Sequence, residues 1–201
     1  MHTDIPMTSR GQLTRSQIIQ TAYHLSAAKG LGALHTRAVA EQAKINIATL
    51  HYYFPTKHDL QIDLLKWVLA RFATTSQDKP STLADELSEA VSWADTDPAM
   101  IALWHDFWNL SRTDSEVKQI LHDHLVGWRS HLASLLQQHY SSVDATLLLA
   151  LALGLPIVAA TLPESWTSET LQAAVKKWIA DTNPKSGDIM STKIREEPEP
   201  I

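Results

Sequence analysis

The residues with the clearest chemical potential lie on one short helical pattern between Asn46 and Pro55. Ile47, Leu50 and Phe54 recur at i, i+3 and i+7, so these apolar side chains would face a core. The side chains left facing outward carry small, hydroxyl, imidazole and phenol groups: Ala48, Thr49, His51 and Tyr52. A short helix with this face suits a DNA groove, where such groups reach phosphates and base edges. The alternative interpretation is an ordinary solvated helix face.

A second short helical pattern precedes this one and would hold it in place. Its apolar residues Val39, Ala40 and Ala43 recur at i, i+1 and i+4, and the turn at 44–46 separates the two patterns. The Asn46 side chain can accept a hydrogen bond from the first free N–H groups of the next helix. Two short helices joined by a tight turn predict a helix-turn-helix, the DNA-binding motif.

Longer helical patterns flank this motif. One begins at Thr14 and ends at Gly30, which supplies a left-handed cap. Another begins at Thr56, where Thr56 and Asp59 resemble a capping box, and continues to about Ser76. Five more helical stretches come after it, without strand-like alternation. The sequence therefore predicts an all-α protein of about nine helices.

Charge is distributed unevenly along the 201 residues. The net charge is −5, but residues 1–60 hold six Lys and Arg against three acids, a surplus of three positive charges. Residues 61–201 hold 11 Lys and Arg against 19 acids. The basic end could therefore meet phosphate while the acidic remainder stays away from it. The absence of cysteine excludes disulfides and thiolate metal sites, and with no apolar leader we expect a cytoplasmic protein.

The N-terminal quarter resembles the TetR family of transcriptional regulators. The stretch 36–40, TRAVA, is similar to the family's first short motif helix, and the pattern T-L-Y-x-(Y/H)-F-x-(S/N)-K-x-x-L is similar to the stretch 49–60, TLHYYFPTKHDL. Departures from the family's usual sequence include Lys44, which replaces a glycine usual in the turn, and His51, which replaces a tyrosine. Lys44 would then need a left-handed backbone at a modest cost.

The resemblance implies roles for individual residues. The hydroxyl groups of Thr36, Thr49 and Tyr53 and the ammonium group of Lys57 would bind phosphates. Arg37 would contact a guanine, and the His51 imidazole could replace a phosphate-binding phenol. The predicted DNA-contact set is Thr36, Arg37, Asn46, Ile47, Ala48, Thr49, His51, Tyr52, Tyr53 and Lys57. The implied domains are a flexible N-terminal arm (1–13), a helix-turn-helix DNA-binding domain (14–58), a helical effector-binding and dimerisation domain (59–182) and a disordered C-terminal tail (183–201).

The predicted helix 98–112 carries two apolar stripes, so other helices should surround it. In the family that this chain resembles, a helix at this place lines an effector cavity. The predicted effector-binding set is Trp93, Trp104, His105, Trp108 and Trp128. Aromatic walls suit flat aromatic or cationic small molecules. The alternative is that the tryptophans only fill a core.

Metal binding and catalysis receive little support from the sequence. His124 and His131 would share a helix face, but two neutral histidines without a third ligand make a poor metal site. The chain shows no nucleophile–base motif and no glycine-rich phosphate loop. We therefore expect no metal, no cofactor and no enzymatic activity.

The last two helical patterns predict that the chain pairs with a second copy of itself. The apolar run 147–160 has about 14 residues, too short for a bilayer at roughly 20, so we expect a buried helix. The resemblance implies that the last two helices pair with their copies, although packing within one chain is the alternative. The predicted dimer interface is Leu151, Leu155, Leu171, Val175 and Trp178.

The function implied is a homodimeric repressor that binds a palindromic double-stranded DNA operator and is released by a small-molecule effector. The alternative is an effector-independent DNA-binding regulator, an activator or nucleoid-type factor, with a filled core. The volume of any cavity in the body separates the two hypotheses.

Overall fold

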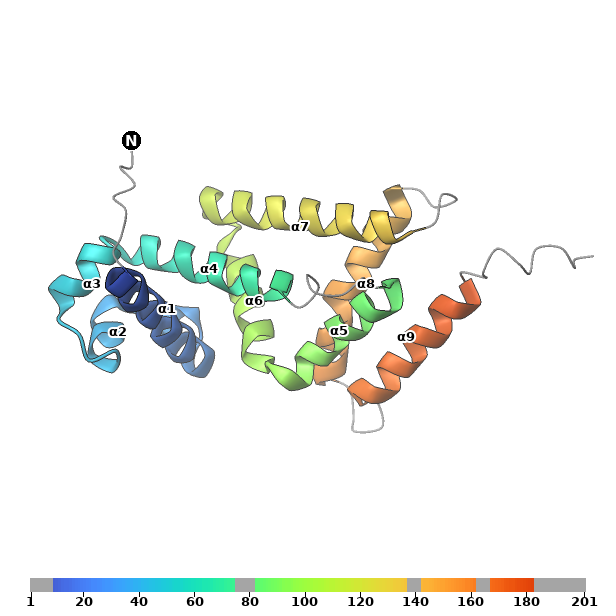
Figure 1. The fold of residues 1–201 in the computed structure, drawn as a ribbon, viewed down its shortest axis with the longest axis horizontal. Helices are drawn as coiled ribbons and strands as arrows, with labels where there is room; N and C mark the ends of the chain where they lie inside the picture. Colours follow the sequence, from blue (N-terminus) through green and yellow to red (C-terminus); the bar gives the residue numbers. More distant parts are fainter. Residues whose placement is uncertain (1–8, 75–81, 137–141, 162–166, 183–201) are drawn as a thin grey trace, which may run out of the picture.

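The computed structural model describes residues 9–74, 82–136, 142–161 and 167–182, and these residues confirm the all-α prediction. Within them lie nine α-helices, one 3-10 helix (η1) and no strand (Figure 1). The bounds are α1 Ser9–Lys29, η1 Leu31–Ala33, α2 Thr36–Gln42, α3 Ile47–Tyr53, α4 Lys57–Thr74, α5 Leu83–Thr96, α6 Pro98–Leu110, α7 Ser115–Leu135, α8 Ser142–Thr161 and α9 Ser168–Thr182.

The helices form three parts of the molecule. We call α1, η1, α2 and α3 the head and α5 to α9 the body. Helix α4 leaves the head and runs into the body, and α7 lies along one side of it (Figure 1). Helix α1 begins at Ser9, so residues 9–13 are helical and their assignment to a flexible arm was wrong. The rest of the predicted arm and the predicted tail 183–201 lie outside the described residues.

Local sequence explains where several helices begin. The Asn46 side chain accepts a hydrogen bond from the Ala48 N–H at 2.8 Å, which caps α3 as predicted. Asp97 caps α6, and Pro98 occupies the first helical position, where no backbone donor is needed. Thr82 and the side chain of the third helical residue form a reciprocal capping box at α5. These caps satisfy backbone donors that would otherwise lack partners.

Two hydrophobic clusters form the core. The first core joins the head to α4, α6 and α7 and includes the fully buried Leu50, Phe54 and Phe107. The second core joins α5, α7, α8 and α9 around Leu132 and Leu148. Because the first core spans head and body, the helix-turn-helix packs as a continuation of the body.

Helix α8 differs from the buried helix expected from its sequence. Its 18-residue span Asp144–Thr161 is long and apolar enough to cross a membrane by length and composition, which alone is weak evidence. Only 28% of that span is buried. One face packs on α5 and α7, while the other leaves large apolar side chains exposed: Leu147, Leu151, Ile157 and Val158. Apolar residues lie on all sides of α8, and their burial is favourable. In a single copy of the chain, one side of this helix remains exposed to solvent.

Candidate functional site

The helix-turn-helix is held rigidly from its inner side. Val39 of α2 and Leu50 of α3 have no exposed surface, and Phe54, which comes directly after α3, is 1% exposed. The turn between the helices places Lys44 at φ 55°, the left-handed conformation expected there, and the Ile45 N–H donates to the Ala40 carbonyl at 3.0 Å. The outer face of α3 is thereby fixed relative to α2.

The predicted DNA-contact residues share one property, which is that none of them is buried. Five are exposed: Arg37, Asn46, Ala48, His51 and Tyr52. Five are half-buried: Thr36, Ile47, Thr49, Tyr53 and Lys57. Tyr52 is 72% exposed and its ring lies edge-on to that of Tyr53. An exposed tyrosine of this kind is costly in water and useful in a groove, although contact with DNA stays a prediction for the whole set.

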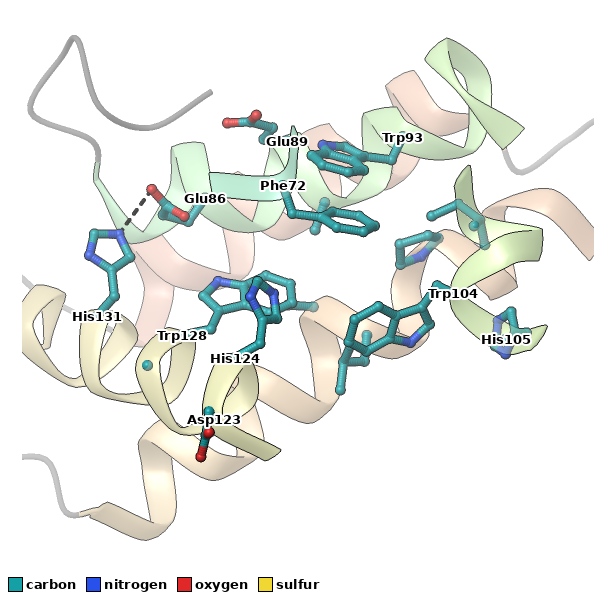
Figure 2. A pocket seen from close by; sticks show the side chains of 16 residues that line it. Phe72, Glu86, Glu89, Trp93, Trp104, His105, Asp123, His124, Trp128 and His131 are labelled. Atoms are coloured by element: carbon teal, nitrogen blue, oxygen red, sulfur yellow. Dashed lines mark ion pairs between the residues drawn. The ribbon is translucent and has the colours of Figure 1, made fainter. Parts of the chain in front are cut away.

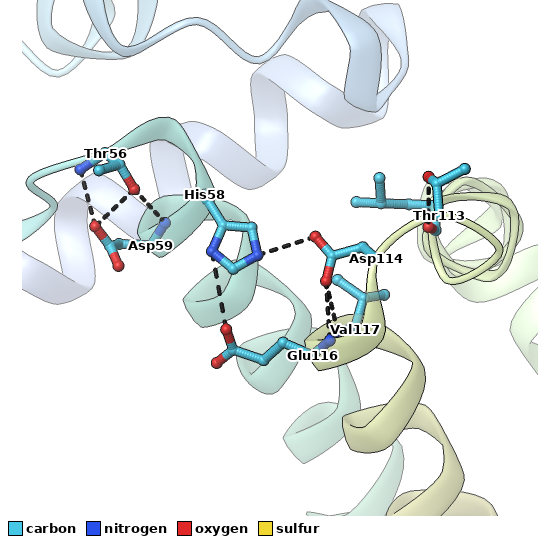
Figure 3. A network of polar contacts seen from close by, with 8 residues as sticks. Thr56, His58, Asp59, Thr113, Asp114, Glu116 and Val117 are labelled. Carbon is cyan, nitrogen blue, oxygen red and sulfur yellow. Dashed lines mark hydrogen bonds and ion pairs between the residues drawn. The ribbon is translucent and has the colours of Figure 1, made fainter.

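The first turn of α4 combines a capping box with a cation. The Asp59 carboxylate accepts hydrogen bonds from the Thr56 N–H at 2.9 Å and hydroxyl at 2.7 Å, and the Asp59 N–H donates to that hydroxyl (Figure 3). This confirms the predicted capping box. Lys57, in the first turn, brings a positive charge to a helix N-terminus, which itself attracts anions.

One joint between α4 and α7 lies next to this turn. His58 Nε2 is 2.9 Å from an Asp114 carboxylate oxygen, and His58 Nδ1 is 3.9 Å from Glu116 (Figure 3). Asp114 is also the cap of α7, accepting from the Glu116 and Val117 N–H groups. The hydrogen bond from Val117, aided by His58, holds the pKa of Asp114 below its usual range. The start of α7 is thus tied to the start of α4.

A second joint connects the head to α6. Asp106 accepts a hydrogen bond from the Leu31 N–H at 2.7 Å, next to the left-handed Gly30. At the start of α6, the Asp97 carboxylate accepts a hydrogen bond from the Tyr23 hydroxyl. A guanidinium nitrogen of Arg71, on α4, lies 3.6 Å from the other oxygen of this carboxylate. Burial and the neighbouring carboxylate raise the pKa of Tyr23 well above its usual value. Tyr23 therefore stays a neutral donor.

A cavity of about 410 Å³ opens between α4, α5, α6, α7 and α8 (Figure 2). The rings of Phe72 and Trp93 stack at 3.9 Å with 4° between their planes. Trp104 lies edge-on to Phe72 at 5.7 Å, and His124 lies 6.0 Å from Trp104. Burial lowers the pKa of His124, so this ring is neutral near pH 7. The cavity is therefore walled by aromatic surfaces and is large enough for a small molecule.

Four of the five predicted effector-binding residues line this cavity: Trp93, Trp104, His105 and Trp128. Trp108 does not line it and is 50% exposed, so its assignment to the cavity was wrong. It shares a helix face with Trp104 but stands one turn nearer the end of α6, beyond the edge of the cavity.

The acidic residues of the cavity and several of its ring-bearing residues were not predicted from the sequence. These are Phe72 of α4, Glu86 and Glu89 of α5, and Asp123, His124 and His131 of α7. One signal was available for Glu86. With Leu83, Leu87 and Ala90 it keeps i, i+3, i+4, i+7 spacing, so it stands within an apolar stripe.

The predicted dimer-interface residues occupy different positions in the protomer. Leu151 and Trp178 are 40% and 47% exposed, and Leu155 and Val175 are half-buried. Leu171 is buried, and α9 packs against α5 within the same chain. Of the predicted set, Leu151 and Trp178 leave the most apolar surface open to a partner.

Comparison with known families assigns both parts of the chain. Residues 18–64 match the model described as bacterial regulatory proteins, tetR family. Residues 81–183, about half of the chain, match the model of the BetI-type transcriptional repressor C-terminal domain. The helix-turn-helix and the body thus match models that describe bacterial regulators.

Individual bacterial regulators are also similar to this chain. The HTH-type transcriptional dual regulator CecR of Shigella flexneri is 37% identical over 62 residues, which are 31% of this chain and 27% of that protein. A regulator from Saccharomonospora viridis in complex with choline has a TM-score of 0.68 at 19% identity, covering 84% of this chain and 96% of that one. The multidrug binding protein EbrR complexed with malachite green has a TM-score of 0.64 at 20% identity, covering 81% and 96%. The two structures show a shared fold, and the family models carry the assignment: the chain belongs to the TetR family of bacterial transcriptional regulators.

Proposed function

We propose that this chain is a homodimeric repressor that binds a palindromic operator through α3 and leaves it when a small molecule enters the cavity. The observation that carries the proposal is that three helices serve both the cavity and the head. Helix α4 brings Phe72 to the cavity and Lys57 to the head. Helix α6 brings Trp104 to the cavity and Asp106 to the head.

The third shared helix is α7. It lines the cavity with His124 and Trp128 and holds His58 of α4 through Asp114. A ligand that shifts α4 or α6 therefore shifts a contact to the head at the same time, and one that shifts α7 shifts its contact to the start of α4. Coupling of this kind is typically about 1–3 kcal/mol and acts in both directions, so operator DNA should weaken effector binding by the same factor.

Two features support an aromatic or cationic effector. The cavity walls are mostly rings, which attract flat molecules and, through their quadrupoles, cations. The two structural relatives named above bind choline and malachite green, which are both organic cations. The cavity of about 410 Å³ also favours a ligand-responsive regulator over an effector-independent one with a filled core.

The open face of α8 supports the dimer. Leu147, Leu151 and Val158 lie on one side of the helix and are 60%, 40% and 40% exposed. A contiguous apolar face marks an interaction site in a water-soluble protein, and a second copy would cover it through a two-fold axis. The two α3 helices would then enter major grooves about 34 Å apart on a palindromic site, in the cytoplasm.

Selection of bound fragments from a random DNA pool tests the proposal directly. We expect a palindrome, with half-sites separated by about one helical turn. Gel shifts on that operator should then weaken about 5- to 150-fold when an organic cation that binds the protein is added. Transcription from a promoter carrying the operator should fall with the protein and recover with the cation. A selected sequence without symmetry, or an operator affinity that no small molecule changes, would contradict the proposal.

A further inference from the structure

Glu86 is a buried carboxylate at the edge of the effector cavity. Its residue is only 7% exposed, although it stands on α5 among apolar neighbours. Among the described residues, its Oε1 atom has no hydrogen-bond donor. Oε1 of Glu89, one turn further along α5, is buried without a donor as well. Burying a carboxylate oxygen without a hydrogen-bond donor is unfavourable, so this side of the cavity favours a positive charge.

The one cationic group facing Glu86 within the cavity lining is His131 of α7. Its Nε2 atom lies 3.1 Å from Glu86 Oε1 (Figure 2). The two atoms are close enough for an ion pair, but their alignment does not make a hydrogen bond, and both atoms lack one among the described residues. The pair therefore depends on charge, which His131 has only when it is protonated.

The rest of the cavity suits the apolar part of a cation. Trp93 and Phe72 form a stacked wall next to α5, and Trp128 and His124 of α7 face it. Ring faces attract an ammonium or a delocalised cation, most strongly away from water. A carboxylate at the edge of such a cage distinguishes a cation from a neutral molecule of the same shape.

We propose that Glu86 recognises the positive charge of the effector, and that protonated His131 is the cation Glu86 holds in its absence, so that the effector and the His131 imidazolium compete for one carboxylate. The inference rests on the proposed function, because it takes the cavity to be the effector site. It adds a pH dependence: cation affinity should rise as the pH rises and His131 loses its charge.

The cavity lining holds other titratable groups besides Glu86 and His131. Glu89 stands on α5 one turn after Glu86, and Asp123 stands on α7. His124 is kept neutral by burial, which lowers its pKa. His105 of α6 stands exposed at the rim. The lining residues from α4 and α8 carry no charge. The hydrogen bonds from Thr82 lower the pKa of Asp85, and the positive charge of Lys176 of α9 contributes to this lowering.

Two probes of equal shape test the charge recognition. Phenyltrimethylammonium and tert-butylbenzene differ only in a quaternary nitrogen and a carbon at the same place. We expect the full-length protein to bind the cation at least about tenfold more tightly at pH 8, as measured by calorimetry and tryptophan fluorescence. Glu86→Gln should remove this preference and leave tert-butylbenzene binding unchanged. Equal binding of the two probes to the wild type, or no binding of the cation, would overturn the inference.

The proton competition is tested with His131→Gln. The wild type should bind the cation roughly fivefold or more tightly at pH 8 than at pH 6, and tert-butylbenzene equally at both. His131→Gln should bind the cation tightly at both pH values. The matched control is His122→Gln, an exposed residue of α7 outside the cavity, which should keep the wild-type pH dependence. A pH dependence that persists in His131→Gln would refute the competition.

Operator binding separates this inference from the proposed function. Both variants should bind the operator as the wild type does, because neither residue lies near the head. If neutral molecules release the operator and cations do not, the inference fails and the proposed function stands. If no small molecule releases it, the proposed function itself fails. If Glu86→Gln does not fold, as judged by its melting temperature, the inference is still tested by the binding of the two probes to the wild type and by His131→Gln.

Discussion

The outer face of α2 and α3 and the cavity of the body are built in opposite ways. The face takes its residues from one continuous stretch, 36–57, and shows them to solvent around a buried interior. The cavity collects its residues from five helices, and several of them, such as Trp93 and Trp104, are also core residues. Exposed residues of the face, such as Tyr52, can therefore change at little cost to the fold, whereas residues of the cavity would carry both recognition and stability.

The largest effect should come from the core beneath the DNA-facing surface. Phe54→Ala removes a ring that is 1% exposed and should lower the free energy of unfolding by about 3–5 kcal/mol. Because Phe54 comes directly after α3, operator binding should be lost as well. Leu132→Ala, in the second core, should cost about 2–5 kcal/mol but spare operator binding while folded. Urea unfolding measures the stability of the two variants, and gel shifts measure their operator binding. Loss of operator binding in folded Leu132→Ala would contradict the expected difference between the two cores.

On the surface itself, two cations should behave differently. Arg37→Ala should reduce the preference for the selected operator over mismatched sites by about 1–3 kcal/mol, because arginine reads guanine with two hydrogen bonds. Lys57→Ala should weaken binding to all sequences alike and lower the salt slope by about one per protomer. Fluorescence anisotropy at several salt concentrations separates the two results. An equal loss of sequence preference in both variants would contradict these roles.

The joint between cavity and head should show in the coupling. Asp106→Ala removes the acceptor of the Leu31 N–H and should cost about 1–2 kcal/mol of stability. The effector should then change operator affinity less than in the wild type, while its own affinity for the cavity stays the same. Asn109→Ala, an exposed residue later in α6, is the control. Unchanged coupling in folded Asp106→Ala would show that α6 does not transmit the signal.

The joint between α4 and α7 should show in the pH dependence of stability. The folded pKa of Asp114 is depressed, so its contribution is complete above the unfolded pKa and is lost as the pH falls through the folded one. Asp114→Ala should therefore cost about 1 kcal/mol at pH 7 and progressively less below about pH 4. Asp114→Asn, which can still cap α7, should cost less at pH 7. Urea unfolding at both pH values provides the measurement, and a cost that does not decline in acid would argue against the charge.

The smallest effect should be a gain in the turn. Lys44→Gly should stabilise the protein by about 0.5–1 kcal/mol, because a side chain at φ 55° is disfavoured and glycine is not. Glu41→Gly, inside α2, should instead destabilise it by a similar amount. Thermal melting of the two variants checks the sign. A loss of stability in Lys44→Gly would mean that the lysine side chain makes a compensating contact.

The contrast between face and cavity also explains what the sequence could predict. Helical spacing identifies Leu50 and Phe54 as inward, and it leaves the residues between them outward, so the face can be predicted from local pattern. The same spacing gives the direction of Trp108 but not its depth along the axis relative to other helices. The start of α1 at Ser9 was missed because residues 9–13 carry no apolar repeat.

The remaining differences depend on long-range packing. Glu86 has the composition of a solvated residue, and only the arrival of α7 and its His131 makes it part of a cavity. The exposed side of α8 reflects a surface that one chain does not cover. Residues whose environment comes from elsewhere in the chain, or from another chain, cannot be placed by periodicity.

Helix α4 sets the mechanical scale of the response. Phe72 in the cavity and Lys57 at the head lie on the same unbroken helix, 15 residues apart, or about 22 Å. A pivot of about 10° near Phe72 would move Lys57 by roughly 4 Å at this helical rise. With two heads moving in opposite directions, the spacing of the recognition helices would change by up to roughly 8 Å, a large misfit to a groove repeat of about 34 Å. In the proposed mechanism, a ligand contact that moves one end of α4 by about an ångström would thus be enlarged into a misalignment of the recognition helices on DNA.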